Sequence, residues 1–450
     1  MTGALLTDFY ELNMAASYKR RHMEGMATFS LFVRTLPAER GFLVAAGIED
    51  CLAFLETFCF EQTDLAYLAG KGFSAEELDW LADMRFTGDV RAVPEGRIVF
   101  AEEPLVEVDA PIAEAQLVET FLLNEITFQT TLASKAARCR IASAGKIELV
   151  EFGFRRTQGI EAGLAAARLA IMTGFSATSN VEAARRFGLR PSGTMAHSYI
   201  EAFPSEIQAF EAFADDRPAH VTFLVDTYDT IRGVAHAIEV IRKRRLGSVA
   251  AIRIDSGDLI GLSSLSRHML DEAGLTDVRI FVSGGLDEHD LAALVACGAP
   301  VDAAGIGTRV GVSADAPYLD SAYKLVAYEG RPVAKLSTGK STYPGAKQVF
   351  RDITGRSRLG EADQLGLAGE SPPPGTEPLL QRVMEGGKRT RAAGEPAAAL
   401  REARDRFEAD LAELGAGALR LVHPDPPMPK LSRSLSTLTG EVHGMLGDQV

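Results

Sequence analysis

The middle of this 450-residue chain alternates short apolar runs with amphipathic stretches. Runs rich in β-branched and apolar residues cover 147–152, 220–226, 249–255, 278–283, 301–306 and 331–336. Four of them begin at residues 220, 249, 278 and 301, and helical patterns at 231–243, 263–272 and 286–296 fill the intervals. Spacing near 30 residues is typical of β-α-β units, so the pattern predicts a parallel sheet with helices between its strands. We expect an α/β fold, an irregular (β/α) barrel rather than a Rossmann sheet.

The two ends of the chain have a different pattern. Residues 43–55 predict a buried helix, and residues 91–100 alternate like a pair of strands around a Pro-Glu-Gly turn. Residues 397–414 predict a charged amphipathic helix with a solvated face. We therefore expect an N-terminal α+β domain over 1–130, the barrel over 131–345, and a C-terminal segment over 346–450 that packs on the barrel or on the N-terminal domain.

Composition restricts the class of protein. The net charge of −14 argues against nucleic-acid binding, which needs a basic surface, but a local arginine cluster can still bind a small anion. Four cysteines without a CxxC pair make a disulfide framework or a zinc site improbable and indicate a reducing compartment. The N-terminus lacks the pattern of a signal peptide, and the longest weakly polar run, 291–307, is too short to span a bilayer. We expect a soluble, cytoplasmic protein without membrane or nucleic-acid partners.

Acidic residues gather where two of the predicted strands end. The segments VDTYDT (225–230) and RIDSGD (253–258) hold Asp226, Asp229, Asp255 and Asp258. Capping of the following helices explains Asp229 and Asp258 well, but not the other two aspartates. Carboxylates crowded at one rim suit a metal-chelated diphosphate or a cationic ribosyl transition state.

Cationic and aromatic residues follow another predicted strand. EFGFRRTQG (151–159) places Arg155 and Arg156 directly after Phe152 and Phe154, a combination suited to a flat ligand with a carboxylate or phosphate. SGTMAHSYIEAF (192–203) surrounds His197 with small residues, which leaves room for a ligand; nucleophilic and acid–base roles are both open.

Two glycine-rich segments resemble nucleotide-binding motifs without matching them. GIGTRVG (305–311) is one residue away from a dinucleotide fingerprint, and at the end of a late barrel strand it suits a phosphate cradle or simply a tight turn. AKLSTGKS (334–341) lacks the first glycine of a P-loop. Its Lys340, with Lys347 and Arg351 beyond it, is open to two interpretations, a site for a phosphate-rich ligand or a solvated basic loop.

Taken in order, these segments resemble the nicotinate phosphoribosyltransferase family. The matching text includes LLTDFYELNM (5–14), SKAARCR (134–140), EFGFRRTQG, residues 174–203, VDTYDT, RIDSGD, VSGGLDE, GIGT and PGAKQVFR, and so spans residues 5–351. The resemblance implies an irregular barrel of the type II phosphoribosyltransferase kind with an N-terminal domain, in a homodimer that shares its active sites. It also implies a reaction of nicotinate with 5-phosphoribosyl 1-diphosphate, with Mg²⁺ as cofactor and ATP as co-substrate.

The resemblance implies a role for each matching residue. His197 is the residue that ATP phosphorylates transiently, beside Ser198, and Arg253 and Asp255 hold the ribosyl diphosphate near Asp226. Arg155 meets the nicotinate carboxylate or the phosphoribosyl group. Phe152 or Phe154 contacts the pyridine ring, and Tyr10 stacks on it from a neighbouring subunit. The implied 5′-phosphate ligands are Ser283, Gly284, Gly285, Gly305, Gly307 and Thr308, and Lys135 and Arg138 line the same anionic pocket.

Three rival interpretations stay open from the residues. A nicotinamide-specific relative fits less well, because Arg155 and Arg156 favour an acidic substrate. A quinolinate-specific relative fits the charge, but chain length and the GTMAHS segment argue against it. A catalytically silent scaffold on the same barrel predicts loss of charged rim residues, yet His197, Arg253 and Asp255 are present.

Overall fold

The computed structural model describes residues 3–337 and 341–447. The chain divides into two compact units, unit 1 with Met1–Ser134 and Tyr318–Val450, and unit 2 with Lys135–Pro317. The sequence predicts the second boundary at residue 345. In the structure it lies earlier, between Pro317 and Tyr318, because β12 (Ser321–Tyr328) pairs with β1 (Met26–Val33) along its whole length. The residues after 346 also belong to unit 1.

Unit 2 contains a parallel half-barrel. Within its described residues the strands are β6 (Glu148–Glu151), β7 (Ala177–Thr178), β8 (Val221–Leu224), β9 (Ala250–Ile254), β10 (Arg279–Val282) and β11 (Ala303–Ile306). Their order is β7-β6-β11-β10-β9-β8, and every pairing is parallel. Five of the six strands that the sequence predicts are therefore confirmed, and so is the fold class. Parallel strands aligned in this way bring all their carboxyl ends to one rim of the sheet.

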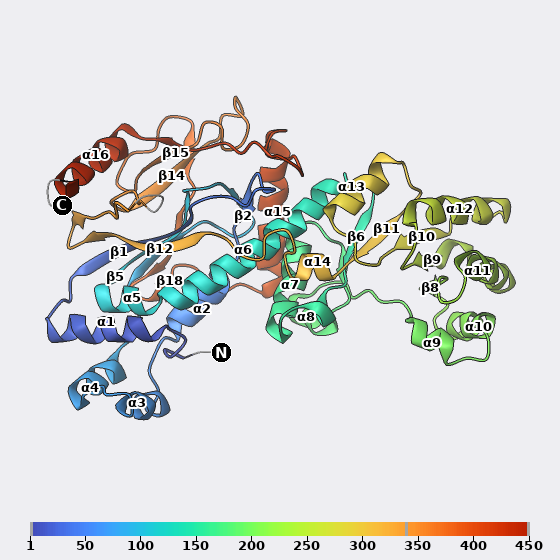
Figure 1. The fold of residues 1–450 in the computed structure, drawn as a ribbon, viewed down its shortest axis with the longest axis horizontal. Helices are drawn as coiled ribbons and strands as arrows, with labels where there is room; N and C mark the ends of the chain where they lie inside the picture. Colours follow the sequence, from blue (N-terminus) through green and yellow to red (C-terminus); the bar gives the residue numbers. More distant parts are fainter. Residues whose placement is uncertain (1–2, 338–340, 448–450) are drawn as a thin grey trace. The chain divides into compact units, whose positions relative to one another are not determined.

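Helices connect the strands of unit 2 (Figure 1). They are α7 (Ile160–Met172), α8 (Val181–Phe187), α9 (His197–Glu201), α10 (Glu206–Asp216), α11 (Thr230–Arg244), α12 (Leu259–Glu272), α13 (Glu288–Ala296) and α14 (Thr308–Gly311), with short 3₁₀ turns η1 (Phe154–Arg156) and η2 (Gly247–Val249). Asp229 accepts a hydrogen bond from the backbone N–H of Arg232 at 2.8 Å, and Asp258 accepts one from Gly261 at 3.1 Å. Both aspartates cap the helices that follow them, as the sequence predicts.

Unit 1 is built mainly on antiparallel pairing, with one parallel pair between β15 and β19. Its seven-stranded sheet has the order β13-β12-β1-β5-β3-β17-β18, and its four-stranded sheet the order β16-β14-β15-β19. The bounds not yet given are β2 (Leu43–Val44), β3 (Asp89–Ala92), β4 (Ile98–Val99), β5 (Pro104–Pro111), β13 (Arg331–Pro332), β14 (Lys347–Asp352), β15 (Gln364–Leu367), β16 (Thr376–Pro378), β17 (Gln381–Glu385), β18 (Lys388–Arg389) and β19 (Lys430–Leu431). Its helices are α1 (Phe9–Arg20), α2 (Ile48–Glu56), α3 (Gln62–Ala69), α4 (Ala75–Asp83), α5 (Ile112–Leu117), α15 (Pro396–Glu413) and α16 (Arg433–Gly447), while α6 (Glu119–Ala142) is shared with unit 2.

Three local predictions are wrong. The run at 331–336 is not a barrel strand, because Glu329 and Gly330 have positive φ and turn the chain back as the β12–β13 hairpin. The helix predicted at 43–55 begins at residue 48, because Gly47 has a φ of +99° and separates it from β2. The strands predicted within 91–100 form but do not pair with each other, since β3 lies beside β5 and β4 lies beside β2.

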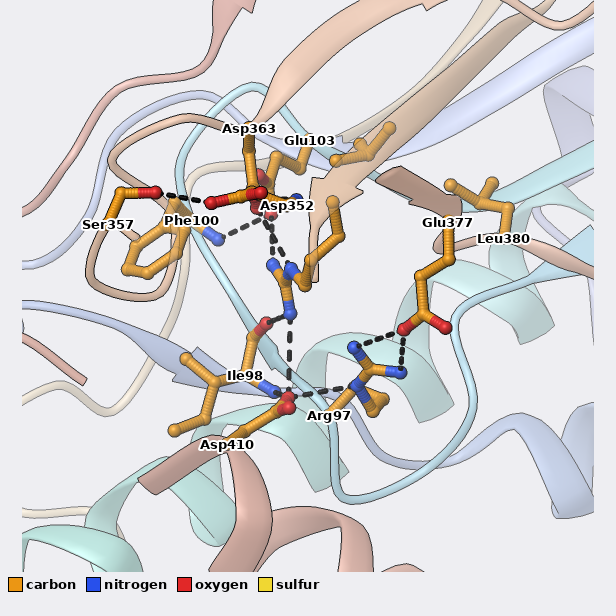
Figure 2. A network of polar contacts seen from close by, with 12 residues as sticks. Arg97, Ile98, Phe100, Glu103, Asp352, Ser357, Asp363, Glu377, Leu380 and Asp410 are labelled. Carbon is orange, nitrogen blue, oxygen red and sulfur yellow. Dashed lines mark hydrogen bonds and ion pairs between the residues drawn. The ribbon is translucent and has the colours of Figure 1, made fainter. Parts of the chain in front are cut away.

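A buried ion-pair network crosses unit 1 (Figure 2). The Arg351 guanidinium lies 2.9 Å from an Asp363 oxygen and 3.4 Å from an Asp410 oxygen, and it donates to the Ile98 carbonyl at 2.7 Å. The same Asp410 oxygen accepts hydrogen bonds from Arg97 at 2.9 Å and from the backbone N–H of Ile98 at 2.8 Å. We call these residues the Arg351 network.

The network corrects two interpretations of the sequence. Arg351 is about 1% exposed, so neither a phosphate ligand nor a solvated loop describes it. Lys347 is also buried and donates to the Gly345 carbonyl at 2.8 Å, with a Glu107 oxygen 3.5 Å away. Lys340 lies outside the described residues. The helix predicted at 397–414 forms as α15, but Asp410 turns inward and makes it part of the core.

Hydropathy places no described helix within a membrane: none of them combines the length and the apolar character that crossing a bilayer requires.

Candidate active site

Arg253 lies at the centre of a polar cluster at the carboxyl rim of the half-barrel. Its guanidinium donates to the Ser283 hydroxyl at 2.8 Å, to the Thr194 hydroxyl at 3.0 Å and to the Asp255 carboxylate at 2.6 Å. The Ser283 hydroxyl in turn donates to Asp255. The ends of β9 and β10 and the segment before α9 therefore meet at one guanidinium, which the surrounding acceptors hold in a single orientation.

His197 is the first residue of α9 and faces this cluster. Its Nδ1 lies 3.1 Å from the Thr227 hydroxyl oxygen, and its Nε2 lies 3.8 Å from an Asp255 carboxylate oxygen. The side chain is 41% exposed, so a ligand in solvent can reach the ring. Burial acts to raise the pKa of Asp255, but the Ser283 hydroxyl, the Arg253 guanidinium and His197 outweigh it and hold that pKa below its usual value. Asp255 is therefore a carboxylate at neutral pH.

Asp226 supports the same rim from the end of β8. One oxygen, Oδ2, accepts hydrogen bonds from the backbone N–H of Asp255 at 2.9 Å and from the Ser256 hydroxyl at 2.7 Å. The other oxygen, Oδ1, is buried and has no hydrogen-bond partner among the described residues. A buried carboxylate oxygen without a donor has capacity for a ligand hydroxyl or a cation.

The structure distinguishes the two phenylalanines of EFGFRR. The Phe152 ring packs on Phe281, with ring centroids 5.6 Å apart, and the Arg253 guanidinium lies 5.4 Å from its centroid. Phe154 instead packs against α7, where a Cβ at Gly163 would be 2.3 Å from its ring. Of the two, only Phe152 belongs to the cluster around Arg253.

Arg155 and Ser198 are both exposed, in two different segments that follow strands of the half-barrel. Arg155 lies in η1, and its guanidinium is exposed and forms no ion pair with the described residues, so its charge is available to a ligand. Ser198 follows His197 at the start of α9.

Glycine is needed in the implied phosphate site for two different structural reasons. Gly284 and Gly285 form an exposed turn after β10 with φ values of +106° and +74°, which only glycine adopts readily. Gly307 and exposed Thr308 form the turn into α14. Gly305 lies inside β11, buried, where a Cβ would be 2.6 Å from the Phe152 ring, so its missing side chain makes room for that ring.

Lys135 and Arg138 lie where their charges are already compensated. The Lys135 ammonium lies 2.5 Å from a Glu288 oxygen and 3.1 Å from an Asp315 oxygen, and Arg138 Nε donates to Glu288 at 2.8 Å. All four side chains are at least nine-tenths buried. The structure thus gives these two cations an internal ion-pair cluster where the sequence predicts an anionic pocket.

Tyr10 belongs to unit 1, at the start of α1, and its side chain is about half exposed. Its neighbour Glu11 is fully buried and accepts hydrogen bonds from the Thr7 hydroxyl and, at 2.7 Å, from the Thr120 hydroxyl. Burial raises the pKa of Glu11 to about 7, assisted by Glu119 and opposed by the two hydroxyls.

Replacement of Glu11 by glutamine is expected to flatten the pH dependence of stability. A carboxyl group with a pKa of 4.5 when unfolded and about 7 when folded binds more protons in the folded state between these values. Its contribution to the free energy of unfolding is therefore full below pH 4.5 and is lost as pH rises through 7. One such proton changes stability by at most about 1.4 kcal/mol per pH unit. Denaturant titrations from pH 4.5 to 8 measure the slope. Glu76→Gln, on the exposed side of α4, is the control, and equal slopes for wild type and Glu11→Gln contradict the prediction.

Sequence reasoning missed three residues of the cluster. Thr194 and Thr227 orient Arg253 and His197, and Phe281 completes the aromatic pair. Both threonines lie within segments already singled out, SGTMAHS and VDTYDT, at strand or helix ends. Phe281 had no such signal, because inside a strand it looks like any core residue.

A parallel half-barrel whose rim joins an aromatic-backed arginine, two aspartates and two glycine turns defines a phosphoribosyltransferase of the type II class. Residues 5–127 match the nicotinate phosphoribosyltransferase N-terminal domain, and residues 147–351 match the nicotinate phosphoribosyltransferase family. A nicotinate phosphoribosyltransferase of Mycobacterium tuberculosis is 52% identical over 86% of this chain and 83% of its own length, and one of Bacillus subtilis is 43% identical over 82% and 76%. The crystal structure of human nicotinic acid phosphoribosyltransferase superposes with a TM-score of 0.85 at 28% identity, covering 97% of this chain and 99% of the human one. The chain belongs to the nicotinate phosphoribosyltransferase family, which confirms the resemblance inferred from its motifs.

Proposed function

We propose that this protein joins nicotinate to 5-phosphoribosyl 1-diphosphate, giving nicotinate mononucleotide and diphosphate, as a step of NAD biosynthesis. The observation that carries the proposal is the Arg253 cluster, in which one guanidinium is tied to Asp255 and Ser283 and lies over the Phe152 ring. Such a cluster offers a flat apolar face for a pyridine ring beside groups that bind a ribosyl diphosphate.

Each group has a place in the transfer. The pyridine nitrogen of nicotinate attacks C1 of the ribose as the bond from C1 to the diphosphate oxygen breaks, and positive charge develops on the ribose. The carboxylates of Asp226 and Asp255 stabilise that charge. Phe152 packs on the pyridine ring, exposed Arg155 binds the nicotinate carboxylate, and the turns at 284–285 and 307–308 bind the 5′-phosphate through backbone N–H groups.

Mg²⁺ fits the donor set at this rim. Asp226 offers a buried oxygen without a donor, and Asp255 offers a second carboxylate, both hard oxygen ligands of the kind that Mg²⁺ prefers. Bound there, the cation would neutralise charge on the departing diphosphate.

We further propose that ATP drives the reaction through His197. A ring nitrogen takes the γ-phosphoryl group of ATP and releases ADP, and water later removes that group as inorganic phosphate. The phosphoryl group adds roughly two negative charges next to Asp255 and Arg253, and this change in charge favours a rearrangement of the rim.

A homodimer in which Tyr10 of one subunit stacks on the pyridine bound by the other completes the proposal. The four free cysteines support a cytoplasmic location.

A product assay tests this function directly. Purified protein is incubated with 5-phosphoribosyl 1-diphosphate, Mg²⁺ and nicotinate, nicotinamide or quinolinate, with and without ATP, and the nucleotides are separated by chromatography. Nicotinate mononucleotide from nicotinate, in larger yield with ATP, supports the proposal. Product from nicotinamide alone or quinolinate alone identifies one of the rival substrates, and absence of every product supports the scaffold.

Replacement of Arg155 by alanine is expected to raise the KM for nicotinate about 10- to 100-fold, because an exposed guanidinium is lost that pairs with the substrate carboxylate. Initial-rate kinetics measure the change. Arg156→Ala, one position further in η1, is the matched control and is expected to have a much smaller effect. Wild-type kinetics for Arg155→Ala place the anion site elsewhere.

A further inference from the structure

The two glycine turns proposed for the 5′-phosphate follow neighbouring strands. The turn at 283–285 follows β10 and the turn at 307–308 follows β11, and the register between these strands ends at Val282 and Ala304. Beyond that point each turn packs closely against the end of the neighbouring strand on its outer side. A Cβ at Gly284 would lie 1.9 Å from the backbone oxygen of Asp255, and one at Gly307 would lie 2.9 Å from that of Phe152. The first turn is thus held against the end of β9 and the second against the end of β6.

An ion pair joins the two turns to each other. Arg309, in α14 directly after the second turn, donates through Nη1 to the carboxylate of Asp287, two residues after the first turn. The same nitrogen lies 3.6 Å from an Asp290 oxygen. Asp287 is itself held in place, because its Oδ1 accepts the backbone N–H groups of His289 at 2.9 Å and Asp290 at 3.1 Å as the N-cap of α13. The Asp287 side chain is 11% exposed and that of Arg309 is 48% exposed.

We propose that the Asp287–Arg309 pair is a positioning device that sets the separation of the two glycine turns, so that their backbone N–H groups converge on one phosphate. The inference rests on the proposed function, since it takes this phosphate to be the 5′-phosphate of the substrate. A half-exposed ion pair contributes little to global stability. Its effect falls instead on the distance between the two turns, because it links them directly beyond the last paired residues of β10 and β11. Binding to several convergent donors depends steeply on such distances.

Burial acts to raise the pKa of Asp287, but the backbone N–H of Asp290 and the Arg309 guanidinium outweigh it and hold that pKa below its usual value. The carboxylate is therefore charged, and the pair intact, at neutral pH. Titratable groups near these two residues include Asp290, Glu288 and His289 on α13 and Cys139 on α6.

A double-mutant cycle tests the device. Asp287→Asn keeps an oxygen that caps α13 and removes the charge, while Arg309→Gln removes the guanidinium. Each single variant is expected to raise the KM for 5-phosphoribosyl 1-diphosphate about three- to fivefold, with kcat and the KM for nicotinate within about twofold of wild type. The KM of the double variant for 5-phosphoribosyl 1-diphosphate is expected to be no higher than that of the more strongly affected single variant, because both substitutions remove the same link. Arg309→Lys is expected to restore part of the loss.

Ribose 5-phosphate binding, measured by calorimetry, gives a second readout that needs no catalysis. The variants are expected to bind it three- to fivefold more weakly than wild type. Asp215→Asn breaks the surface pair with Arg244 at the ends of α10 and α11 and is the matched control, with unchanged kinetics and binding. Additive losses in the cycle, or unchanged ribose 5-phosphate affinity, overturn the device. Absence of nicotinate mononucleotide from the wild type overturns the proposed function instead, and the binding measurement then still decides the inference.

Discussion

Replacement of His197 by alanine is expected to reduce ATP hydrolysis by at least about 100-fold while leaving some transfer that is not coupled to ATP. The reason is chemical: the proposed phosphoryl acceptor is a ring nitrogen, and alanine offers no nucleophile. The transfer itself relies on the Arg253 cluster, in which the Asp255 carboxylate lies 3.8 Å from the His197 ring. Phosphate release from ATP and formation of nicotinate mononucleotide, measured in the same reaction, separate the two effects.

The control for this variant is His268→Ala. His268 lies exposed on α12, where it pairs with Glu272 on the surface. The variant is expected to keep both activities. Unchanged ATP hydrolysis in His197→Ala would refute the phosphohistidine role, and loss of all transfer would mean that His197 also acts in the transfer step.

Replacement of Arg351 by methionine is expected to lower the free energy of unfolding of unit 1 by about 3–5 kcal/mol, because it leaves buried carboxylates without their cation. Methionine fills much of the same volume, so loss of charge dominates over loss of packing. Asp363 and Asp410 lose a partner at 2.9 and 3.4 Å, and Glu103 loses one at 3.7 Å. Hydrogen exchange of α15 and β14, together with thermal unfolding, measures the loss within unit 1.

The loss should also depend on pH. Burial raises the pKa of Glu103 to about 7 even with Arg351 present, and removal of the guanidinium raises it further. A carboxyl group whose pKa is raised in the folded state stabilises that state below its unfolded pKa, and this contribution is lost as pH rises through the folded pKa. The variant is therefore expected to lose less stability at pH 5 than at pH 8. Arg391→Met, which breaks the surface pair with Glu402, is the control, with an expected effect below about 1 kcal/mol. Equal stability of the two variants contradicts the prediction.

Local pattern predicted the half-barrel well and unit 1 poorly. The strands β8 to β11 recur at nearly constant spacing, and each is followed by its own helix, so each β-α unit is visible within about 30 residues. In unit 1 the partners are far apart along the chain: β1 pairs with β12, and β3 pairs with β17. Nothing within one strand specifies a partner some 290 residues away.

The site residues divide in the same way, into those with a local signal in the sequence and those whose place depends on distant segments. Arg253, Asp255 and His197 could be named because charged or titratable residues at strand and helix ends are unusual enough to be informative. The sequence does not distinguish Phe152 from Phe154, since both precede the same pair of arginines, and only the packing at Gly163 and Gly305 assigns each ring its place. The sequence places Lys135 and Arg138 in an anion pocket for a similar reason, because their carboxylate partners Glu288 and Asp315 lie about 150 or more residues further along the chain.

The α/β class with its parallel sheet, the family and the order of the rim motifs follow from the sequence alone, because strand spacing and motif text are local properties. Which charges face a ligand and which neutralise each other inside the protein becomes clear only from the folded structure. Arg351 and Lys347 look like a basic loop in the sequence, yet they lie buried against carboxylates from distant segments. The physical reason is that the free energy of a charge depends on its burial and its partners, and both are set by chain segments that meet only when the protein has folded.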